Sequence, residues 1–320
     1  MPEGRSTGTI ATLELANTGG KARRWPPPLR LGDVVSVVAP SGPYDPDRVR
    51  RGADILRSWG LTVRFVDRAA GPQHRLRYMS ADDRTRAEDF AAGWCDSGTR
   101  AIWAARGGYG AQRMIDLLDF EALRVGGVKH LIGFSDVTAL HTRIGRELGQ
   151  VTIHGPLVGS LSQLHDPPSV EALRTLIMTS PAPGRVLASG DCVVTGTATG
   201  RLWGGNLSLL ASDVGVEPAP QEPCVMIVED IGEDSYQIDR MLTQLARAGW
   251  LDQVVGIGVG QFSSNPTSDL LEHVVTDRLA GLGVPVIAGL EIGHGDRNLA
   301  LPLGAQVRLI AGESGVSGRS

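Results

Sequence analysis

The sequence is poor in the side chains that cross-link proteins or hold metal ions. It contains three cysteines, Cys95, Cys192 and Cys224, which lie far apart and form no CxxC pair. Its seven histidines include no HExxH pair and no cluster with cysteine at zinc spacing. We therefore expect buried free thiols in a reducing compartment, with no metal and no cofactor.

Long apolar runs and a strong excess of charge are also missing. No window reaches the length of a membrane span, and the first thirty residues lack the apolar core of a secretory signal. The formal net charge is −4, which gives no electrostatic reason to bind nucleic acid or a lipid surface. The sequence thus predicts a cytoplasmic protein with neither nucleic acid nor a membrane as partner.

Glycine, in contrast, is abundant: 42 of 320 residues, about twice the usual ~7%. It falls at the ends of apolar runs such as DVVSVVAPSGP, which is typical of tight turns between buried parallel strands and helices. Over roughly 120 residues from Leu31, such strands alternate with helical patterns. This alternation predicts a parallel, layered α/β sheet of the Rossmann or flavodoxin type.

Changes in composition divide the chain into five stretches. Residues 1–30 are rich in Gly, Thr and Ser and end in three prolines, so we expect a flexible extension. Residues 161–188 have proline-rich ends around a short helix and predict a linker. The N-terminal domain then covers 31–160, a smaller C-terminal α/β domain covers 189–312, and 313–320 form a flexible tail.

Open α/β sheets bind ligands at the carboxyl ends of their strands. Five loops are expected there: APSGP (39–43), RGGYG (106–110), GFSD (133–136), VED (228–230) and IGHGD (292–296). The glycine loop RGGYG lacks the dinucleotide fingerprint, because Arg113 stands where a third glycine is needed, and no GxxxxGK[ST] motif occurs. A nicotinamide-dependent oxidoreductase is therefore disfavoured, and the backbone N–H groups of this loop are better suited to an oxyanion.

Ser135 in GFSD has two interpretations. Ser and Asp are preferred N-caps, so the residue is explained if it only begins a helix. A nucleophilic serine on a sharp turn is the alternative, although Val137 replaces the last glycine of the GxSxG elbow.

A serine hydroxyl needs a base, and the base needs an orienting acid. His294 and Glu229 each stand at the end of an apolar strand, so that a Ser, a Glu and a His at three strand ends make a possible triad. A surface carboxylate and a capping histidine explain the same residues. The local sequence does not decide between these interpretations.

Seven segments together resemble the LD-carboxypeptidases, serine peptidases that trim murein tetrapeptides, and their relatives the microcin-immunity peptidases. The similarity spans roughly residues 30–310 in the family's order and spacing. The segments are GDVVSVVAPSGP, RGGYGAQRMIDLLDF, LIGFSDVTALH, IHGP, LWGGNLSLL, VEDIGEDSYQIDRMLTQL and AGLEIGHGDRNLALPLGA.

The resemblance implies a nucleophile, Ser135, in the first domain and two further triad members, Glu229 and His294, in the second. It places the active site at the domain interface and forms the oxyanion hole from the N–H groups of Gly108 and Asp136. It further implies a metal-free homodimer that cleaves the bond between L-lysine or meso-diaminopimelate and a terminal D-alanine in a small peptide.

A carboxypeptidase must recognise a free carboxylate, for which arginine is the usual residue. Arg106 beside the glycine loop and Arg240 in QIDRML are candidates, and Trp203 and Asn206 in LWGGN are candidates for the cleft. Arg240 is explained equally well if it holds its helix against a neighbouring element, and Trp203 is explained equally well if it only packs against other side chains.

Two other functions remain open. One keeps the chemistry but cleaves a peptidyl-nucleotide antibiotic, as the immunity relatives do. The other is a non-catalytic binding domain of the same fold, which the joint presence of Ser135, Glu229 and His294 disfavours.

Overall fold

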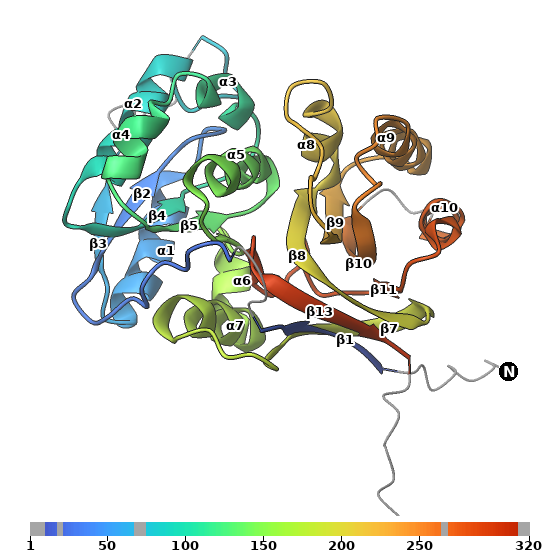
Figure 1. The fold of residues 1–320 in the computed structure, drawn as a ribbon. Coiled ribbons are helices and arrows are strands. Elements are labelled where there is room, and N and C mark those ends of the chain that lie inside the picture. The colour runs from blue at the N-terminus through green and yellow to red at the C-terminus, as the bar shows by residue number, and fades with distance from the viewer. Residues whose placement is uncertain (1–9, 18–21, 67–74, 264–267, 313–320) are drawn as a thin grey trace, which may run out of the picture.

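The computed structural model describes residues 10–17, 22–66, 75–263 and 268–312. These form two sheets covered by helices, the two-part α/β architecture that the sequence predicts (Figure 1). No helix in the described part of the chain is long and apolar enough to cross a membrane.

The first sheet has six strands in the order β12-β6-β5-β4-β2-β3. All neighbours pair in parallel except β12, which runs antiparallel to β6. The strands are β2 (Val34–Val38), β3 (Thr62–Phe65), β4 (Thr99–Ala104), β5 (His130–Gly133), β6 (Thr152–His154) and β12 (Leu301–Leu303).

Helices on the two faces of this sheet connect its strands in flavodoxin-like order. The chain order therefore reverses between β2 and β4, and the loops after these two strands flank a crevice where such folds bind ligands. The helices are α1 (Pro46–Ser58), α2 (Asp83–Cys95), α3 (Ala111–Ile115), α4 (Phe120–Val125), the 3₁₀ turn η1 (Ser135–Val137), α5 (Thr138–Leu148), α6 (Leu161–His165) and α7 (Pro167–Met178).

The second sheet closes into a barrel in the order β1-β13-β8-β9-β10-β11-β7. Its strands are β1 (Ile10–Leu15), β7 (Val186–Val194), β8 (Gly196–Asn206), β9 (Cys224–Ile231), β10 (Val254–Ser263), β11 (Val286–Ala288) and β13 (Gln306–Ala311). Its helices are α8 (Leu207–Ser212), α9 (Ser235–Arg247), α10 (Ser268–Leu279) and the 3₁₀ turn η2 (Ala280–Leu282).

Three stretches differ from the sequence-based division of the chain. The predicted flexible extension contains β1, which pairs with β13 and β7, because Ala11, Leu13 and Leu15 alternate on a buried face. The predicted linker contains α6 and α7 and the start of β7. The predicted C-terminal domain returns one strand, β12, to the first sheet.

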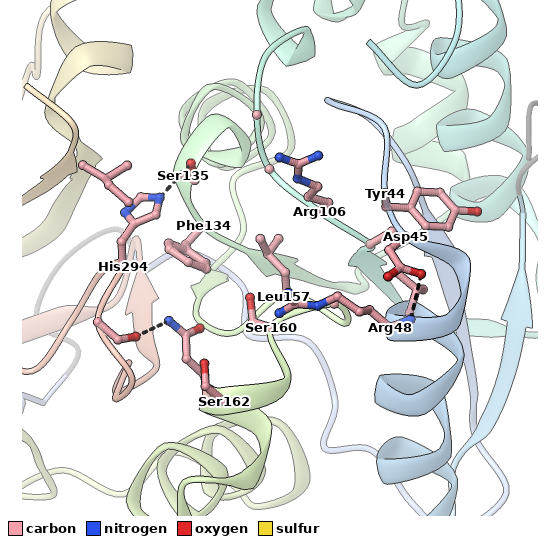
Figure 2. Close-up of a pocket in the computed structure, with 18 of the residues that line it drawn as sticks. Tyr44, Asp45, Arg48, Arg106, Phe134, Ser135, Leu157, Ser160, Ser162 and His294 are labelled. Atoms are coloured by element: carbon pink, nitrogen blue, oxygen red, sulfur yellow. Dashed lines mark hydrogen bonds between the residues drawn. The ribbon is translucent and has the colours of Figure 1, made fainter. Parts of the chain in front are cut away.

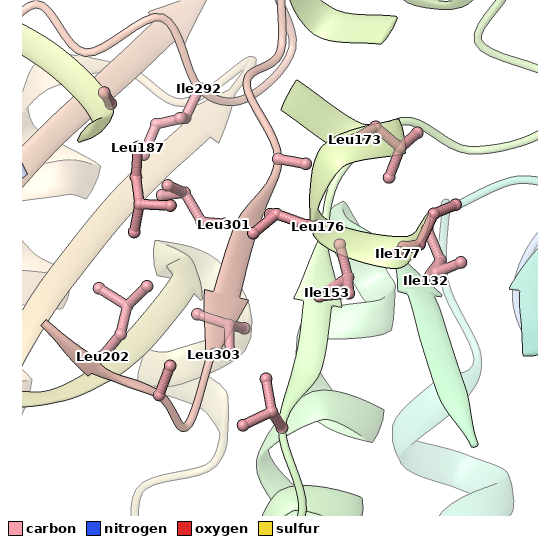
Figure 3. Packing of buried hydrophobic residues seen from close by; sticks show 14 of the residues in the cluster. Ile132, Ile153, Leu173, Leu176, Ile177, Leu187, Leu202, Ile292, Leu301 and Leu303 are labelled. Carbon is pink, nitrogen blue, oxygen red and sulfur yellow. The ribbon is translucent and has the colours of Figure 1, made fainter. Parts of the chain in front are cut away.

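One apolar cluster joins the two sheets (Figure 3). Ile132 and Ile153 of the first sheet, Leu176 of α7 and Leu202 of the barrel all belong to it, together with Leu301 of β12. A close-packed cluster of this kind fixes the relative position of the elements that form it. The cluster therefore fixes the position of the barrel relative to the first sheet.

A substitution in β1 tests whether this N-terminal strand stabilises the barrel. Because Leu13 is 1% exposed, Leu13→Ala should lower the free energy of unfolding by about 2–5 kcal/mol. Leu31→Ala is the matched control, since Leu31 is 79% exposed and should change stability little. Urea titration measures both, and equal stability of the two variants would show that β1 does not contribute to the barrel.

Candidate active site

Ser135 lies on a strained turn immediately after β5. Its φ of 63° makes it the one residue other than glycine with positive φ among the described residues. Its hydroxyl makes no capping bond, since the turn η1 has no side-chain cap and α5 begins only at Thr138. Instead, Ser135 Oγ lies 3.1 Å from His294 Nε2 (Figure 2). The geometry thus favours the strained, functional interpretation over the helix cap.

Glu229 and His294 come from the second sheet. Glu229 lies near the end of β9 with its side chain fully buried, and its Oε2 lies 2.7 Å from His294 Nδ1. A carboxylate at Nδ1 holds the proton there and leaves the Nε2 lone pair facing the Ser135 hydroxyl. Burial raises the pKa of the Glu229 carboxyl, while its contact with His294 lowers it.

Two glycines make room for this row of side chains. A Cβ on Gly107 would lie 3.0 Å from Ser135 Cβ and 3.1 Å from its Oγ. A Cβ on Gly293, whose φ is +115°, would lie 2.7 Å from Glu229 Oε2. Gly293 therefore requires glycine, and a side chain at Gly107 would press against Ser135.

The loop that carries His294 is held by buried amides. Gln163 Nε2 donates to the carbonyls of Gly293 (3.0 Å) and Gly295 (2.9 Å), and Asn298 Oδ1 accepts from Gly293 N–H at 3.0 Å. The ring of Phe134 packs 4.7 Å from the imidazole, centroid to centroid. Gln163 has no signal in the sequence, because an isolated glutamine in a short helix belongs to no motif.

The two predicted oxyanion donors lie on neighbouring loops. In the described residues, the N–H groups of Gly108 and Asp136 donate to no backbone or side-chain acceptor. The Asp136 carboxylate accepts from Ala111 N–H at 2.8 Å and so ties the serine turn to the glycine loop.

A buried arginine, which the sequence analysis did not single out, braces the same loops. Arg86 is 2% exposed and donates to the carbonyls of Pro40 and Gly110, after the ends of β2 and β4. It also pairs with Asp83. Removing a guanidinium from water costs free energy, which these fixed hydrogen-bond partners and Asp83 offset.

Ser135 and His294 open onto a pocket of about 700 Å³ (Figure 2). Arg106 also lines it, as the sequence analysis expects of a substrate contact, and its Nη1 donates to the carbonyl of Pro43. The α1 side of the pocket is formed by Tyr44 and Arg48.

The other three predicted substrate contacts do not line this pocket. Trp203 packs against Trp250 with ring centroids 5.8 Å apart and borders a separate cavity of about 190 Å³. Asn206 is 3% exposed, and its Nδ2 donates to Asp230 at 2.9 Å. Arg240 stacks over the ring of Tyr236, 5.7 Å from its centroid, which fits the role of a helix brace. Asn206 is therefore placed beside Glu229 rather than in the pocket, and its hydrogen bond to that carboxyl lowers the pKa of Glu229.

Three histidines lie buried in the first sheet and in α5, and two of them, His141 and His154, lie near the serine turn. Burial lowers the pKa of His154 to about 3 and those of His130 and His141 to about 4. His141 Nε2–H donates to the carbonyl of Gly133 at 2.8 Å, directly before the turn. All three are therefore neutral in the folded protein at pH 7.

These histidines predict a loss of stability in mild acid. Below pH ~6.5 the unfolded chain protonates each imidazole, whereas the folded chain does so only near pH 4 or below. Stability is therefore complete above pH 6.5 and should fall by about 2 kcal/mol per histidine at pH 5. Burial also raises the pKa of Asp213, to about 6, and the pKa values of Asp136 and Glu229, and these three carboxyls act in the opposite direction.

Urea titrations across this pH range measure the effect. His141→Gln should lower the pH dependence by about a third. His273→Gln, at an exposed position of α10, is the matched control for replacing a histidine. An unchanged slope in the His141 variant would contradict this account.

Within the described ranges, no group of three or more His, Cys, Asp or Glu side chains could hold a metal ion.

Both halves of the chain match known sequence families. The LD-carboxypeptidase N-terminal domain matches residues 35–155, and the LD-carboxypeptidase C-terminal domain matches residues 199–309. A putative carboxypeptidase of Streptomyces coelicolor is 42% identical over 89% of this chain and 93% of its own length. The murein tetrapeptide carboxypeptidase of Pseudomonas aeruginosa is 32% identical over 88% of this chain and 93% of its own.

Solved structures agree with this fold. The muramoyltetrapeptide carboxypeptidase from Oxalobacter formigenes superposes with a TM-score of 0.73 at 26% identity, covering 88% of this chain and 99% of its own. The microcin C7 self-immunity protein in complex with aspartyl sulfamoyl adenosine superposes with a TM-score of 0.74 at 22% identity, covering 89% and 98%. With both family domains matched in order and close relatives along nearly the whole length, this chain belongs to the LD-carboxypeptidase family.

Proposed function

We propose that this protein is a serine LD-carboxypeptidase that releases terminal D-alanine from murein tetrapeptides through an acyl-enzyme on Ser135. The observation that carries the proposal is the row of contacts from buried Glu229 through His294 to Ser135 at the edge of a pocket. The murein peptidases among the relatives support the choice of substrate.

Acylation follows from the positions of three side chains. His294 Nε2 takes the hydroxyl proton of Ser135 while Oγ attacks the carbonyl carbon of the residue before D-alanine. Buried Glu229 holds the imidazole in place and stabilises its cation. His294 then gives the proton to the leaving amine, and D-alanine departs with its amino group restored.

The oxyanion of the tetrahedral intermediate meets the N–H groups of Gly108 and Asp136. Preorganised donors of this kind are each worth about 10²–10³ in rate. Water, deprotonated by His294, then attacks the ester on Ser135 and releases the tripeptide. The serine regains its proton, and the cycle closes.

A second candidate function is cleavage of a peptidyl-nucleotide, suggested by the immunity protein that binds aspartyl sulfamoyl adenosine. That substrate needs an aromatic surface for its base. Trp203 lies outside the pocket, whose aromatic lining consists of Tyr44 and Phe134. The two arginines of the pocket, Arg48 and Arg106, suit a peptide with free carboxylates better.

Mass spectrometry of L-Ala-γ-D-Glu-diaminopimelate-D-Ala incubated with the protein distinguishes the two candidates. We expect release of D-alanine that aspartyl sulfamoyl adenosine does not inhibit. Failure to release D-alanine, with cleavage of the adenosine compound, would favour the peptidyl-nucleotide function. Binding of either without any hydrolysis would support the non-catalytic domain.

The proposed working form is a cytoplasmic homodimer, as the family resemblance implies. Sedimentation should then give twice the 33.9 kDa mass of the chain.

A further inference from the structure

The pocket contains a second arginine that the proposed mechanism does not use. Arg48 lies in the first turn of α1, the helix that follows β2, while Arg106 follows β4. The two side chains therefore come from the two loops that flank the reversal of strand order, where this fold class binds ligands. Figure 2 shows Arg48 extending from α1 toward Leu157 and Ser160.

Arg48 has no carboxylate partner among the described residues, and it is the one arginine of α1 that lines the pocket. Arg50 pairs with Asp47 at 2.6 Å, and Arg57 pairs with Asp54 at 2.7 Å.

The carboxylate of nearby Asp45 already accepts hydrogen bonds from the backbone. Its Oδ1 accepts from the N–H groups of Asp47 (2.8 Å) and Arg48 (3.3 Å) and so caps the helix. The Arg48 guanidinium is thus left for a ligand in the pocket.

One arginine is sufficient for the carboxyl terminus of a peptide. Arg106 is adjacent to Gly107, where an added Cβ would lie 3.0 Å from Ser135 Cβ, so the backbone of Arg106 lies close to the reacting bond. A single residue leaves in the proposed reaction, and its carboxylate must therefore lie near that bond. The longer acyl part of the peptide must extend along the rest of the pocket, where Arg48 lies.

We propose that Arg48 binds a second carboxylate of the substrate, carried by the acyl part of the peptide, and that Arg106 binds the carboxylate of the leaving residue. This inference rests on the proposed function. A planar guanidinium binds a carboxylate through two parallel hydrogen bonds, and this pairing discriminates strongly against a substrate without the charge.

Two groups in a murein peptide supply such a carboxylate. One is the side-chain carboxylate of diaminopimelate, which lysine lacks. The other is the free α-carboxylate of the γ-linked D-glutamate, which is lost when that residue is amidated. Four tetrapeptides, with either third residue and with or without the amidation, separate the two sources.

The test compares kcat/KM for the four peptides in the parent, in Arg48→Gln and in Arg50→Gln. Arg50→Gln is the matched control, since it lies on the same helix and pairs with exposed Asp47. We expect Arg48→Gln to lose about 10- to 100-fold on peptides with the recognised carboxylate, mainly through KM, and little on peptides without it. The control should keep the preference of the parent.

The results distinguish a failure of the role inferred for Arg48 from a failure of the proposed function. Loss of one preference in Arg48→Gln identifies which of the two carboxylates is bound. An equal fall on all four peptides, or no fall on any, would overturn the role of Arg48 while leaving the carboxypeptidase function intact. No D-alanine release by the parent from any peptide would overturn the proposed function itself, and the inference with it.

Discussion

Ser135→Ala is expected to lower the rate of D-alanine release by about 10⁶-fold. The hydroxyl lies 3.1 Å from His294 Nε2, and no other group in the proposed mechanism forms the acyl-enzyme. Single-turnover assays with the murein tetrapeptide measure the loss. The thermal midpoint should change little, because the side chain makes no capping bond.

Ser162→Ala is the control for this prediction. Ser162 lines the same pocket, but the proposed mechanism gives it no role. Its variant should retain the activity of the parent. Retention of more than about 1% of the activity by Ser135→Ala would exclude an acyl-enzyme on this residue.

Glu229→Gln should lower kcat by about 10⁴-fold while the protein stays folded. Glutamine keeps the shape of the buried side chain but removes the charge that stabilises the His294 cation. Its amide can also donate to Nδ1, which would move the ring proton to Nε2 and leave no lone pair for the serine proton.

Glu291→Gln makes the same chemical change at an exposed position of the loop that carries His294. This variant should be fully active. A Glu229→Gln enzyme with near-parental kcat would show that the buried carboxylate does not act through His294.

The sequence predicts those parts of the fold that local patterns encode. Apolar runs ending in glycine identify the parallel strands. Ser135 and His294 lie after such strands, whereas Glu229 lies within β9, two residues before its end. The strand β1 was expected to be flexible, because six residues of short alternation inside a Gly- and Ser-rich stretch carry little local signal. Its partners lie almost three hundred residues away or on β7, and only long-range pairing stabilises it.

The residues around the candidate site were predicted less completely. Arg86 and Gln163 are buried polar side chains whose hydrogen bonds to loop carbonyls depend on tertiary structure, which no spacing rule describes. Trp203 and Asn206 lie in the last four residues of β8. In the folded protein, Trp203 packs against Trp250, and the Asn206 side chain donates a hydrogen bond to Asp230.

Labelling with a fluorophosphonate, followed by peptide mass spectrometry, tests the central claim most directly. The account predicts a single adduct on Ser135, fast in the parent and strongly slowed in His294→Ala, whose folding is checked by circular dichroism. An intact fold with no adduct on Ser135, or with equal labelling in the His294 variant, would contradict a nucleophilic serine activated by that histidine.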